Sequence, residues 1–261
     1  MSKSIWRGNA VPFSVSQNYL TSSKTIQRLL RLTSISKDDH VIEIGAGKGH
    51  ITRELVKSCR SVSAYEIDSK LLGRLQESLA KNDNLKLSNR DFLKAALPKS
   101  GIYKVFSNIP FSTTSDIVRK LTDINNPPQE AWLVMEKGAA KRFMGVSGDS
   151  LASISIKPFF NIGIVCHFSR DDFHPAPSVD VVLLHLAKKG LPDLLLVERK
   201  SFYTFVDRSI RQGVYSQLTK RQVATALRLA RLPQIKESGH ILYIQWLCLF
   251  RCYHHLHGGQ Q

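Results

Sequence analysis

The sequence is poor in acidic residues and contains no long apolar run. Only 21 Asp and Glu face 37 Lys and Arg among 261 residues, which gives a formal net charge of +16 and a pI near 9.9. Such an excess indicates a polyanionic partner. No apolar stretch reaches the roughly 18 to 20 residues of a membrane span, and residues 1–7 lack the apolar segment of a signal peptide. We therefore expect a cytoplasmic protein without a membrane partner.

Cysteine is also scarce. The chain has 4 Cys, at positions 59, 166, 248 and 252, and this scattered spacing predicts reduced residues packed in a core rather than disulfide bridges. Cys248 and Cys252, with three His beyond them, leave zinc binding as an alternative, but the apolar helical pattern around them favours packing and no metal. We find no repeat and no low-complexity tract. With 43% hydrophobic residues the chain can bury a large core, which excludes a disordered protein.

The positive charge is unevenly distributed. Residues 188–261 carry 12 Lys and Arg against 4 Asp and Glu, so this quarter of the chain holds half of the net charge. The run from Lys188 to Pro192 is typical of a linker. We therefore expect two domains, residues 1–187 and a small, basic domain of residues 188–261 that contacts the polyanionic partner.

Apolar runs of strand type alternate with helical patterns over the first 187 residues. Strands are predicted at His40–Ile44, Ser61–Glu66, Leu85–Ser88, Ile102–Ser107, Ala131–Glu136, Ile162–Phe168 and Val179–Leu186. Helices are predicted at Ile51–Lys57, Ser69–Leu79, Ser115–Leu121 and Lys137–Met144, and after the linker at Ser201–Arg211, Lys220–Arg231 and Tyr243–Tyr253. The alternation indicates an α/β fold with a mostly parallel sheet covered on both faces and closed by an antiparallel pair, followed by an all-α region.

A glycine-rich loop follows the first of these strands. Gly45, Gly47 and Gly49 lie between a strand and a helix, where backbone without Cβ atoms can approach a ligand at the helix N-terminus. Glu66, 21 residues after Gly45, ends the next strand, where a carboxylate can accept from both hydroxyls of a ribose, with Ile67 beside it. Together they predict a nucleoside-bearing cofactor.

The glycines and Glu66 do not separate a nicotinamide dinucleotide from S-adenosylmethionine, since both carry adenosine. Asp91 and Phe92 end the third strand. A carboxylate there can accept from an adenine amino group, and the Phe ring can contact the adenine plane. A cap or turn residue is the alternative for Asp91.

The segment Asn108-Ile109-Pro110-Phe111 follows the fourth strand and resembles the Asn-(Ile/Leu/Pro)-Pro-(Tyr/Phe) motif of methyltransferases that act on exocyclic amino groups. The lone pair of adenine N6 is delocalised into the ring, so the amino group needs acceptors. The side-chain oxygen of Asn108, which also contacts the cofactor, and the carbonyl of Ile109 can accept. Pro110 fixes the turn, and Phe111 can stack on an extruded base. The alternative is a strand-to-loop turn with a buried Phe.

Two flanking segments extend this resemblance. Gln17-Asn18-Tyr19-Leu20 is similar to the segment with which ribosomal RNA adenine dimethyltransferases hold the methionine end of the cofactor. Phe173-His174-Pro175-Ala176-Pro177 is similar to the loop whose Phe lines the opposite wall of their target-base pocket. The resemblance implies a class I, Rossmann-like methyltransferase with a seven-stranded sheet, S-adenosyl-L-methionine as cofactor, and contacts to it from Gln17, Asn18 and Leu20.

Two branches share these motifs. The housekeeping enzymes of the small ribosomal subunit usually carry Pro in the glycine loop and then Asn-Leu-Pro-Tyr. The Erm enzymes modify one adenine of 23S rRNA and confer macrolide, lincosamide and streptogramin B resistance. The loop Gly45–Thr52, the Ile at 109 and the C-terminal segments around Lys220 and Tyr243–Tyr253 resemble Erm. Phe111 departs from the Tyr of many Erm enzymes, which removes a phenolic hydrogen bond.

Clusters of basic residues are expected to contact RNA phosphates without reading sequence. The RNA-binding candidates are Arg7, Lys137, Lys141, Arg142, Arg208 and Arg211. The resemblance implies a monomer that methylates free or nascent 23S rRNA rather than the assembled ribosome. The alternatives are a small-subunit rRNA dimethyltransferase, a non-catalytic RNA-binding relative, and a nicotinamide oxidoreductase, which gives Asn108 no role.

Overall fold

A computed structural model describes residues 18–122, 125–146, 148–235 and 240–257. Arg7 and Gln17, two of the predicted site residues, lie outside these ranges. Within them, no helix is long and apolar enough to cross a membrane. Of the four cysteines only Cys59 is buried, and the other three are half-buried.

The centre of the molecule is a seven-stranded sheet in the order β4-β3-β2-β5-β6-β9-β7. The strands are β2 His40–Ile44, β3 Ser61–Glu66, β4 Leu85–Asn89, β5 Lys104–Asn108, β6 Glu130–Glu136, β7 Phe160–His167 and β9 Val181–Lys188. The first five are parallel, and β9 runs antiparallel to both of its neighbours, β6 and β7. The predicted mostly parallel sheet with an antiparallel closure is therefore confirmed.

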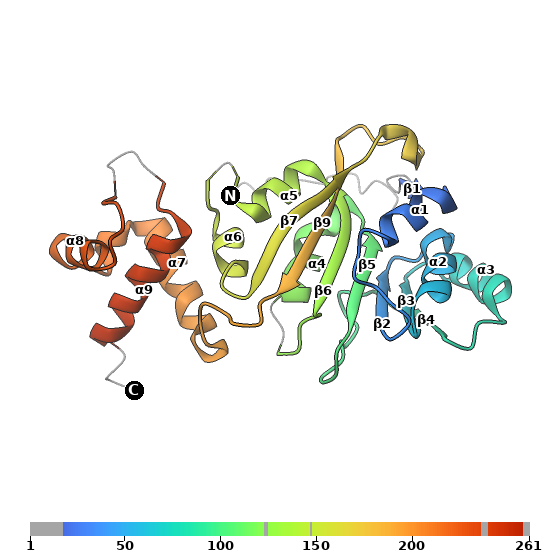
Figure 1. Cartoon of the computed structure of the whole chain (residues 1–261), viewed down its shortest axis with the longest axis horizontal. Coiled ribbons are helices and arrows are strands. Elements are labelled where there is room, and N and C mark those ends of the chain that lie inside the picture. The colour runs from blue at the N-terminus through green and yellow to red at the C-terminus, as the bar shows by residue number, and fades with distance from the viewer. Residues whose placement is uncertain (1–17, 123–124, 147, 236–239, 258–261) are drawn as a thin grey trace, which may run out of the picture.

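Helices cover both faces of the sheet (Figure 1). They are α1 Ser23–Leu30, α2 His50–Ser58, α3 Ser69–Leu79, α4 Thr114–Thr122, α5 Lys137–Met144 and α6 Leu151–Ile156. Strand alternation divides the core: Trp132 and Val134 of β6 pack with α1, α2 and α3, while Leu133 and Met135 pack with α4, α5 and α6. This arrangement leaves the carboxyl ends of β2 and β5 for a ligand.

Local signals account for several helix starts. Asp68 caps α3, where its side chain accepts from the backbone N–H groups of Lys70 and Leu71. Ser150 and Ser153 form a reciprocal cap at the start of α6. Such caps satisfy backbone donors that the first helical turn leaves unpaired.

The sequence patterns did not reveal α1, α6 or the two short strands β1 Tyr19–Leu20 and β8 Phe173–His174. β1 and β8 form their own antiparallel pair, with Tyr19 opposite His174 and Leu20 opposite Phe173. Two-residue strands carry no periodicity, so only the tertiary pairing defines them. The pair joins the N-terminal segment to the loop before β9.

The C-terminal region contains α7 Arg199–Gln212, α8 Lys220–Leu229 and α9 Tyr243–His257, which Figure 1 shows at the end of the molecule opposite α2 and α3. These helices share one hydrophobic cluster with the sheet. Lys188, where a linker is predicted to begin, is the last residue of β9. The segment that follows is tied to α9, because Tyr243 Oη donates to Asp193 Oδ2 at 2.6 Å.

Candidate active site

A crevice opens at the carboxyl ends of β2 and β5. Its walls come from the segment around β1, the end of β2, the start of α2 and the segment after β5. The lining residues are Asn18, Tyr19, Leu20, Glu43, Gly45, Ala46, His50, Ile51, Asn108, Ile109, Pro110 and Phe111. The structure thus brings together the predicted motifs around Asn18, Gly45 and Asn108, which are distant in the sequence.

The amide of Asn108 has a defined orientation. Its Nδ2 donates to the backbone oxygen of Asn18 at 2.6 Å, and an amide oxygen in that position would face another oxygen. Among the residues described, none donates a hydrogen bond to Asn108 Oδ1. The side chain therefore offers an acceptor oxygen at a crevice wall.

The three residues after Asn108 form a short turn into η2, Phe111–Thr113. Ile109 is buried, and its N–H donates to Val134 O at 3.2 Å, which fixes the turn to β6. Pro110 has φ −62° and precedes the half-buried Phe111. All three line the crevice, so the backbone carbonyl and the aromatic ring predicted to meet a base lie beside Asn108.

The three loop glycines differ in their surroundings. Each has a positive φ, and a Cβ built on Gly45 meets no atom within 4 Å. A Cβ on Gly47 would lie 2.7 Å from Tyr19 Cε1, and one on Gly49 would collide with Leu75 of α3. Only Gly45 therefore leaves open space at the crevice, whereas Gly47 and Gly49 allow close packing within the protein.

Glu66 is buried at the end of β3, and its carboxylate accepts hydrogen bonds from two backbone N–H groups. Its Oε2 accepts from Gly47 N at 2.7 Å, and its Oε1 accepts from Asp68 N at 2.8 Å. The carboxylate therefore joins the glycine loop to the cap of α3. Each oxygen keeps a further lone pair for a ligand hydroxyl. The adjacent Ile67 is exposed.

Glu43 is a crevice residue that the sequence patterns did not single out. It lies on the same sheet face as Val41, is 1% exposed, and accepts from Thr52 Oγ1 at 2.6 Å. Burial raises the pKa of Glu43 to about 8, against the lowering effect of the Thr52 hydrogen bond. The available signal in the sequence was an acidic residue inside an apolar strand pattern, two residues before the first loop glycine.

Tyr19 and His50 also line the crevice and were not predicted as site residues. Tyr19 lies against Gly47, and Lys48 Nζ is 5.1 Å from the centre of its ring. Burial raises the pKa of Tyr19, and the charges of Glu66 and Asp68 add to it. Burial, followed by Arg53 and Lys48, lowers the pKa of His50. Both side chains are therefore held in their uncharged forms.

Asp91 and Phe92 lie outside the lining of the crevice, in the loop after β4. Asp91 Oδ1 accepts from Leu93 N at 2.9 Å, and Phe92 is buried with its ring edge against Tyr65 at 5.5 Å. Lys120 of α4 holds this loop, because its Nζ donates to Leu93 O at 2.8 Å and to Ala95 O at 2.6 Å. The loop is thereby fixed to the helix that follows Phe111.

Phe173 does not line the crevice. It is buried opposite Leu20 in the β1–β8 pair and meets Phe168 edge to face at 5.2 Å. Leu20 in turn is a lining residue. Phe173 thus lies beside a lining residue, in the strand that pairs with β1.

The basic candidates within the described part of the chain fall into two groups. Lys137, Lys141 and Arg142 belong to α5, and Arg208 and Arg211 belong to α7. Lys137 pairs with Asp180 at 3.2 Å and Arg211 with Asp207 at 2.8 Å. The side chains of Lys141, Arg142 and Arg208 are exposed and have no ion pair with a described acidic residue. These three are the better placed for phosphates.

The crevice fits a cationic, nucleoside-bearing cofactor. Gly45 leaves open space over the backbone, and Glu43 is a buried carboxyl that a nearby cation would ionise. The carboxylate of Glu66 follows on the neighbouring strand. By contrast, no group of three or more His, Cys, Asp or Glu within the described ranges could hold a metal ion.

Comparison with known proteins agrees with this geometry. The profile of the family described as ribosomal RNA adenine dimethylase matches residues 8–229. An rRNA adenine N-6-methyltransferase from Lysinibacillus sphaericus is 36% identical, and the alignment covers 94% of this chain and 98% of the relative. An rRNA adenine N-6-methyltransferase from Limosilactobacillus reuteri is 35% identical, with 91% of this chain and 95% of the relative covered. Ribosomal RNA small subunit methyltransferase A from Mycoplasmopsis pulmonis is 34% identical, and the alignment covers 73% of this chain and 75% of the relative.

Among solved structures, the 23S rRNA methyltransferase ErmE is similar with a TM-score of 0.78 and 28% identity, over 90% of this chain and 99% of that one. A dimethyladenosine transferase from Plasmodium falciparum shares the fold at 22% identity, with a TM-score of 0.65 over 87% of this chain and 86% of its own. The likeness to ErmE confirms the Rossmann-like methyltransferase fold expected from the sequence.

Proposed function

This chain belongs to the ribosomal RNA adenine dimethylase family, and we propose that it methylates N6 of one adenine of 23S rRNA and so confers macrolide, lincosamide and streptogramin B resistance. As a member it is an rRNA adenine N6-methyltransferase, and its cofactor is S-adenosyl-L-methionine. The orientation of Asn108 is the observation that carries the proposal for the site, because it leaves an acceptor where an amino group must bind.

The likeness to ErmE supports the 23S branch over the small-subunit branch, and the small subunit methyltransferase A of Mycoplasmopsis pulmonis aligns with 73% of the chain. ErmE, whose structure matches 90% of the chain, is a 23S rRNA methyltransferase. The small-subunit target remains the alternative.

The cofactor site is assigned to the crevice and the strand ends beside it. Asn18, Leu20 and Gly45 would hold the methionine end, with Gln17 preceding them in the chain. Glu66 would accept from ribose hydroxyls, and the loop with Asp91 and Phe92 would hold the adenine. When bound, S-adenosylmethionine supplies an electrophilic methyl group on a cationic sulfur. Glu43, ionised by that charge, would then stabilise the cation.

The acceptor side of the reaction falls to the segment after β5. Asn108 Oδ1 and Ile109 O would each accept one hydrogen of the adenine amino group, which localises the nitrogen lone pair for attack on the methyl carbon. Phe111 would stack on the extruded base, and Phe173 would hold β1 in place through its pairing with Leu20. The proton of the methylated nitrogen leaves to water. Catalysis in this account depends on positioning rather than on a strong base.

The RNA-binding assignment extends beyond the crevice. Lys141 and Arg142 follow β6, on the sheet edge that carries the crevice, and would hold phosphates near the target adenine. Lys137, Arg208, Arg211 and Arg7 would add further contacts. In this proposal residues 188–261 act as the basic helical RNA-binding domain, and the chain works as a cytoplasmic monomer on free or nascent 23S rRNA.

The test is methyl transfer from labelled S-adenosylmethionine to protein-free 23S rRNA and to protein-free 16S rRNA. Label in 23S rRNA that disappears when the single target adenine is replaced supports the proposal. Label in 16S rRNA alone, or equal label in the 23S transcript without that adenine, contradicts it.

A further inference from the structure

The outer face of α1 carries a row of basic side chains that the sequence analysis did not single out. Lys24, Arg28 and Arg31 are spaced four and three residues apart, so they lie on one side of the helix, and all three are exposed. Together with Thr25 and Leu32 they line a hollow of about 400 Å³. The opposite side of α1 packs into the core.

These charges are not neutralised by acidic neighbours. None of the three forms an ion pair with a described Asp or Glu. Two acids lie near α1, and neither forms an ion pair with Lys24, Arg28 or Arg31. Glu54 accepts from Ser23, Gln27 and Lys57, and Asp172 accepts from Thr25 and from Ser169 N. The basic row is therefore available to an anionic partner.

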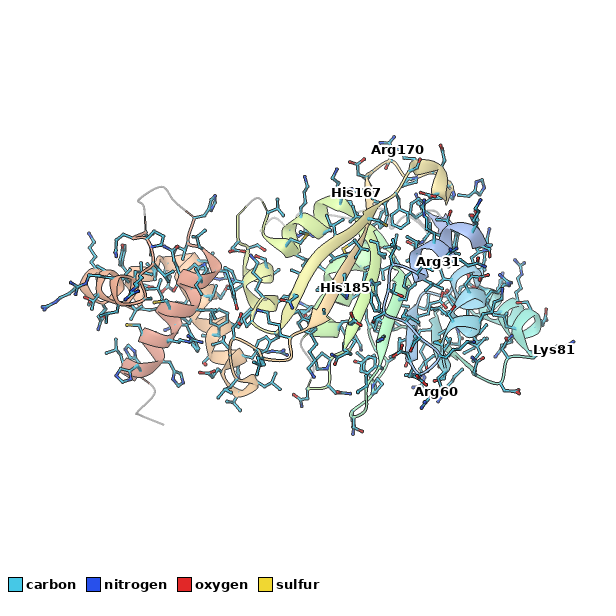
Figure 2. The ribbon with its side chains drawn as sticks, in the orientation of Figure 1. Arg31, Arg60, Lys81, His167, Arg170 and His185 are labelled. Carbon is cyan, nitrogen blue, oxygen red and sulfur yellow. The ribbon has the colours of Figure 1, made fainter. Side chains whose placement is uncertain are left out.

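The helix that carries the row is connected to a wall of the crevice. β1, whose Leu20 lines the crevice, ends only three residues before α1 begins. Thr25 Oγ1 donates to Asp172 Oδ1 at 3.4 Å, and Asp172 directly precedes Phe173 of β8. Figure 2 shows Arg31 on the side of the molecule away from the C-terminal helices. A strand leaving the crevice on that side would pass over α1.

We propose that the outer face of α1 binds phosphates of the substrate RNA on the side of the crevice away from α7, α8 and α9. Lys24 and Arg31 lie seven residues apart, about 10 Å along the helix, which suits successive phosphates of a chain better than one isolated phosphate. This inference rests on the proposed function, since it assumes that an RNA adenine enters the crevice. It gives the RNA a contact on each side of that adenine.

The test compares two double variants that remove the same charge. Arg28→Gln with Arg31→Gln changes the α1 face. Arg74→Gln with Lys81→Gln changes an exposed residue of α3 and one of the turn that follows it. Figure 2 shows Lys81 at the end of the molecule opposite the C-terminal helices. Dissociation constants are measured for whichever protein-free rRNA the wild-type protein labels, at several salt concentrations. Calorimetric binding of S-adenosylhomocysteine and the melting temperature are measured alongside.

We expect the α1 variant to bind RNA roughly tenfold or more weakly at 0.1 M salt, and the slope of log K against log salt to fall by about 1.5 to 2. The α3 variant should stay within about twofold of wild type. Equal affinities, or the same loss in both variants, would overturn the proposal. Which rRNA the wild type labels decides the proposed function separately.

A third variant covers the case in which the α1 change disturbs folding. Arg28→Lys with Arg31→Lys keeps both charges on the same helix face and should bind RNA within about threefold of wild type. If this variant loses as much affinity as the Gln variant while its melting temperature is unchanged, charge on α1 is not what binds the RNA.

Discussion

Two side chains at the crevice are prepared for different partners. Asn108 presents an acceptor oxygen because Asn18 O takes its amide hydrogen. Glu43 is kept protonated near neutral pH because burial raises its pKa to about 8. The Asn108 oxygen suits an amino group, and the Glu43 carboxyl suits a cation. Methyl transfer from a sulfonium to adenine N6 requires a site for each of these two groups.

Glu43 predicts a proton release on cofactor binding. Around pH 7, binding of cationic S-adenosylmethionine should ionise Glu43, so calorimetry in two buffers of different ionisation enthalpy should report released protons. S-adenosylhomocysteine, which lacks the sulfonium charge, should release fewer. Glu43→Gln should abolish the difference between the two ligands; a difference that persists in this variant contradicts the role given to Glu43.

The same carboxyl predicts a pH dependence of stability. The pKa of Glu43 is higher in the folded protein than its usual 4.5, so its contribution to stability is full below about pH 4.5 and is lost as pH rises towards 8. The melting temperature of Glu43→Gln minus that of the wild type should therefore rise between pH 6 and pH 9, by at least about 2 °C. A difference in melting temperature that stays constant across that pH range would contradict the prediction.

Glu66 predicts a coupling between loop structure and cofactor binding. Glu66→Ala removes the acceptor for Gly47 N and Asp68 N as well as the expected ribose contact, so affinity for S-adenosylmethionine should fall roughly tenfold or more. Glu66→Gln keeps one acceptor oxygen, so its affinity for S-adenosylmethionine should lie between those of the wild type and Glu66→Ala. Calorimetry that finds unchanged affinity in the Ala variant would remove Glu66 from the cofactor site.

At the scale of elements, α4 connects the two halves of the site. It begins after Phe111, and its Lys120 is bound to the carbonyls of the loop with Asp91 and Phe92. Burial lowers the pKa of Lys120, against the raising effect of Asp91. The helix therefore connects that loop to the segment predicted to hold the base. Lys120 is a positioning residue rather than a catalytic one.

Lys120→Met should raise the KM for S-adenosylmethionine by roughly 5-fold or more, with kcat within about 2-fold. The physical reason is that the carbonyls of Leu93 and Ala95, in the loop with Asp91 and Phe92, lose a charged donor. The neighbouring Arg119→Gln, an exposed residue paired with Asp116, is the matched control and should leave KM unchanged. A loss of kcat at constant KM would place Lys120 in another role.

Elements with strong periodicity were predictable from the sequence. β2, β3, α3 and α5 have the bounds expected from their patterns, because their buried faces repeat at strand or helix spacing. α6 and β1 were not found, since a six-residue helix and a two-residue strand depend on a serine cap and on pairing with β8.

Site residues that belong to a sequence motif could be predicted. Site residues whose chemical properties depend on burial in the fold could not. The glycine loop and Asn108–Phe111 were found as sequence motifs, and both line the crevice. Glu43 gains its character only from burial, and Tyr19 and His50 from neighbours brought in by the fold. That Phe173 lies beside Leu20, outside the crevice lining, could not be predicted either, since this depends on a pairing of segments about 150 residues apart.

At the scale of the whole molecule, the sheet and the C-terminal helices share one hydrophobic cluster, although a linker separates them in the sequence. Phe205 of α7 packs against Phe250 and Tyr253 of α9, with ring centres 5.8 and 5.0 Å apart. These rings hold α7 and α9 together, and the shared cluster joins both helices to the sheet by apolar packing.

Phe205→Ala should lower the free energy of unfolding by about 3 to 5 kcal/mol and keep a single calorimetric transition. Tyr203→Ala, on the exposed side of the same helix, should change it by less than about 0.5 kcal/mol. Two transitions, of which only one shifts in the Phe205 variant, would show that the helices unfold independently of the sheet.

The central claim is that the crevice bounded by Asn18, Gly45 and Asn108 transfers a methyl group to adenine N6 of rRNA. Mass spectrometry of nucleosides from rRNA incubated with S-adenosylmethionine tests it most directly. We predict N6-methyladenosine or N6,N6-dimethyladenosine with the wild-type protein. With Asn108→Ala we expect a product at least roughly 100-fold lower and retained cofactor binding. Methylation of another base or position, or an undiminished product from Asn108→Ala, would contradict the account.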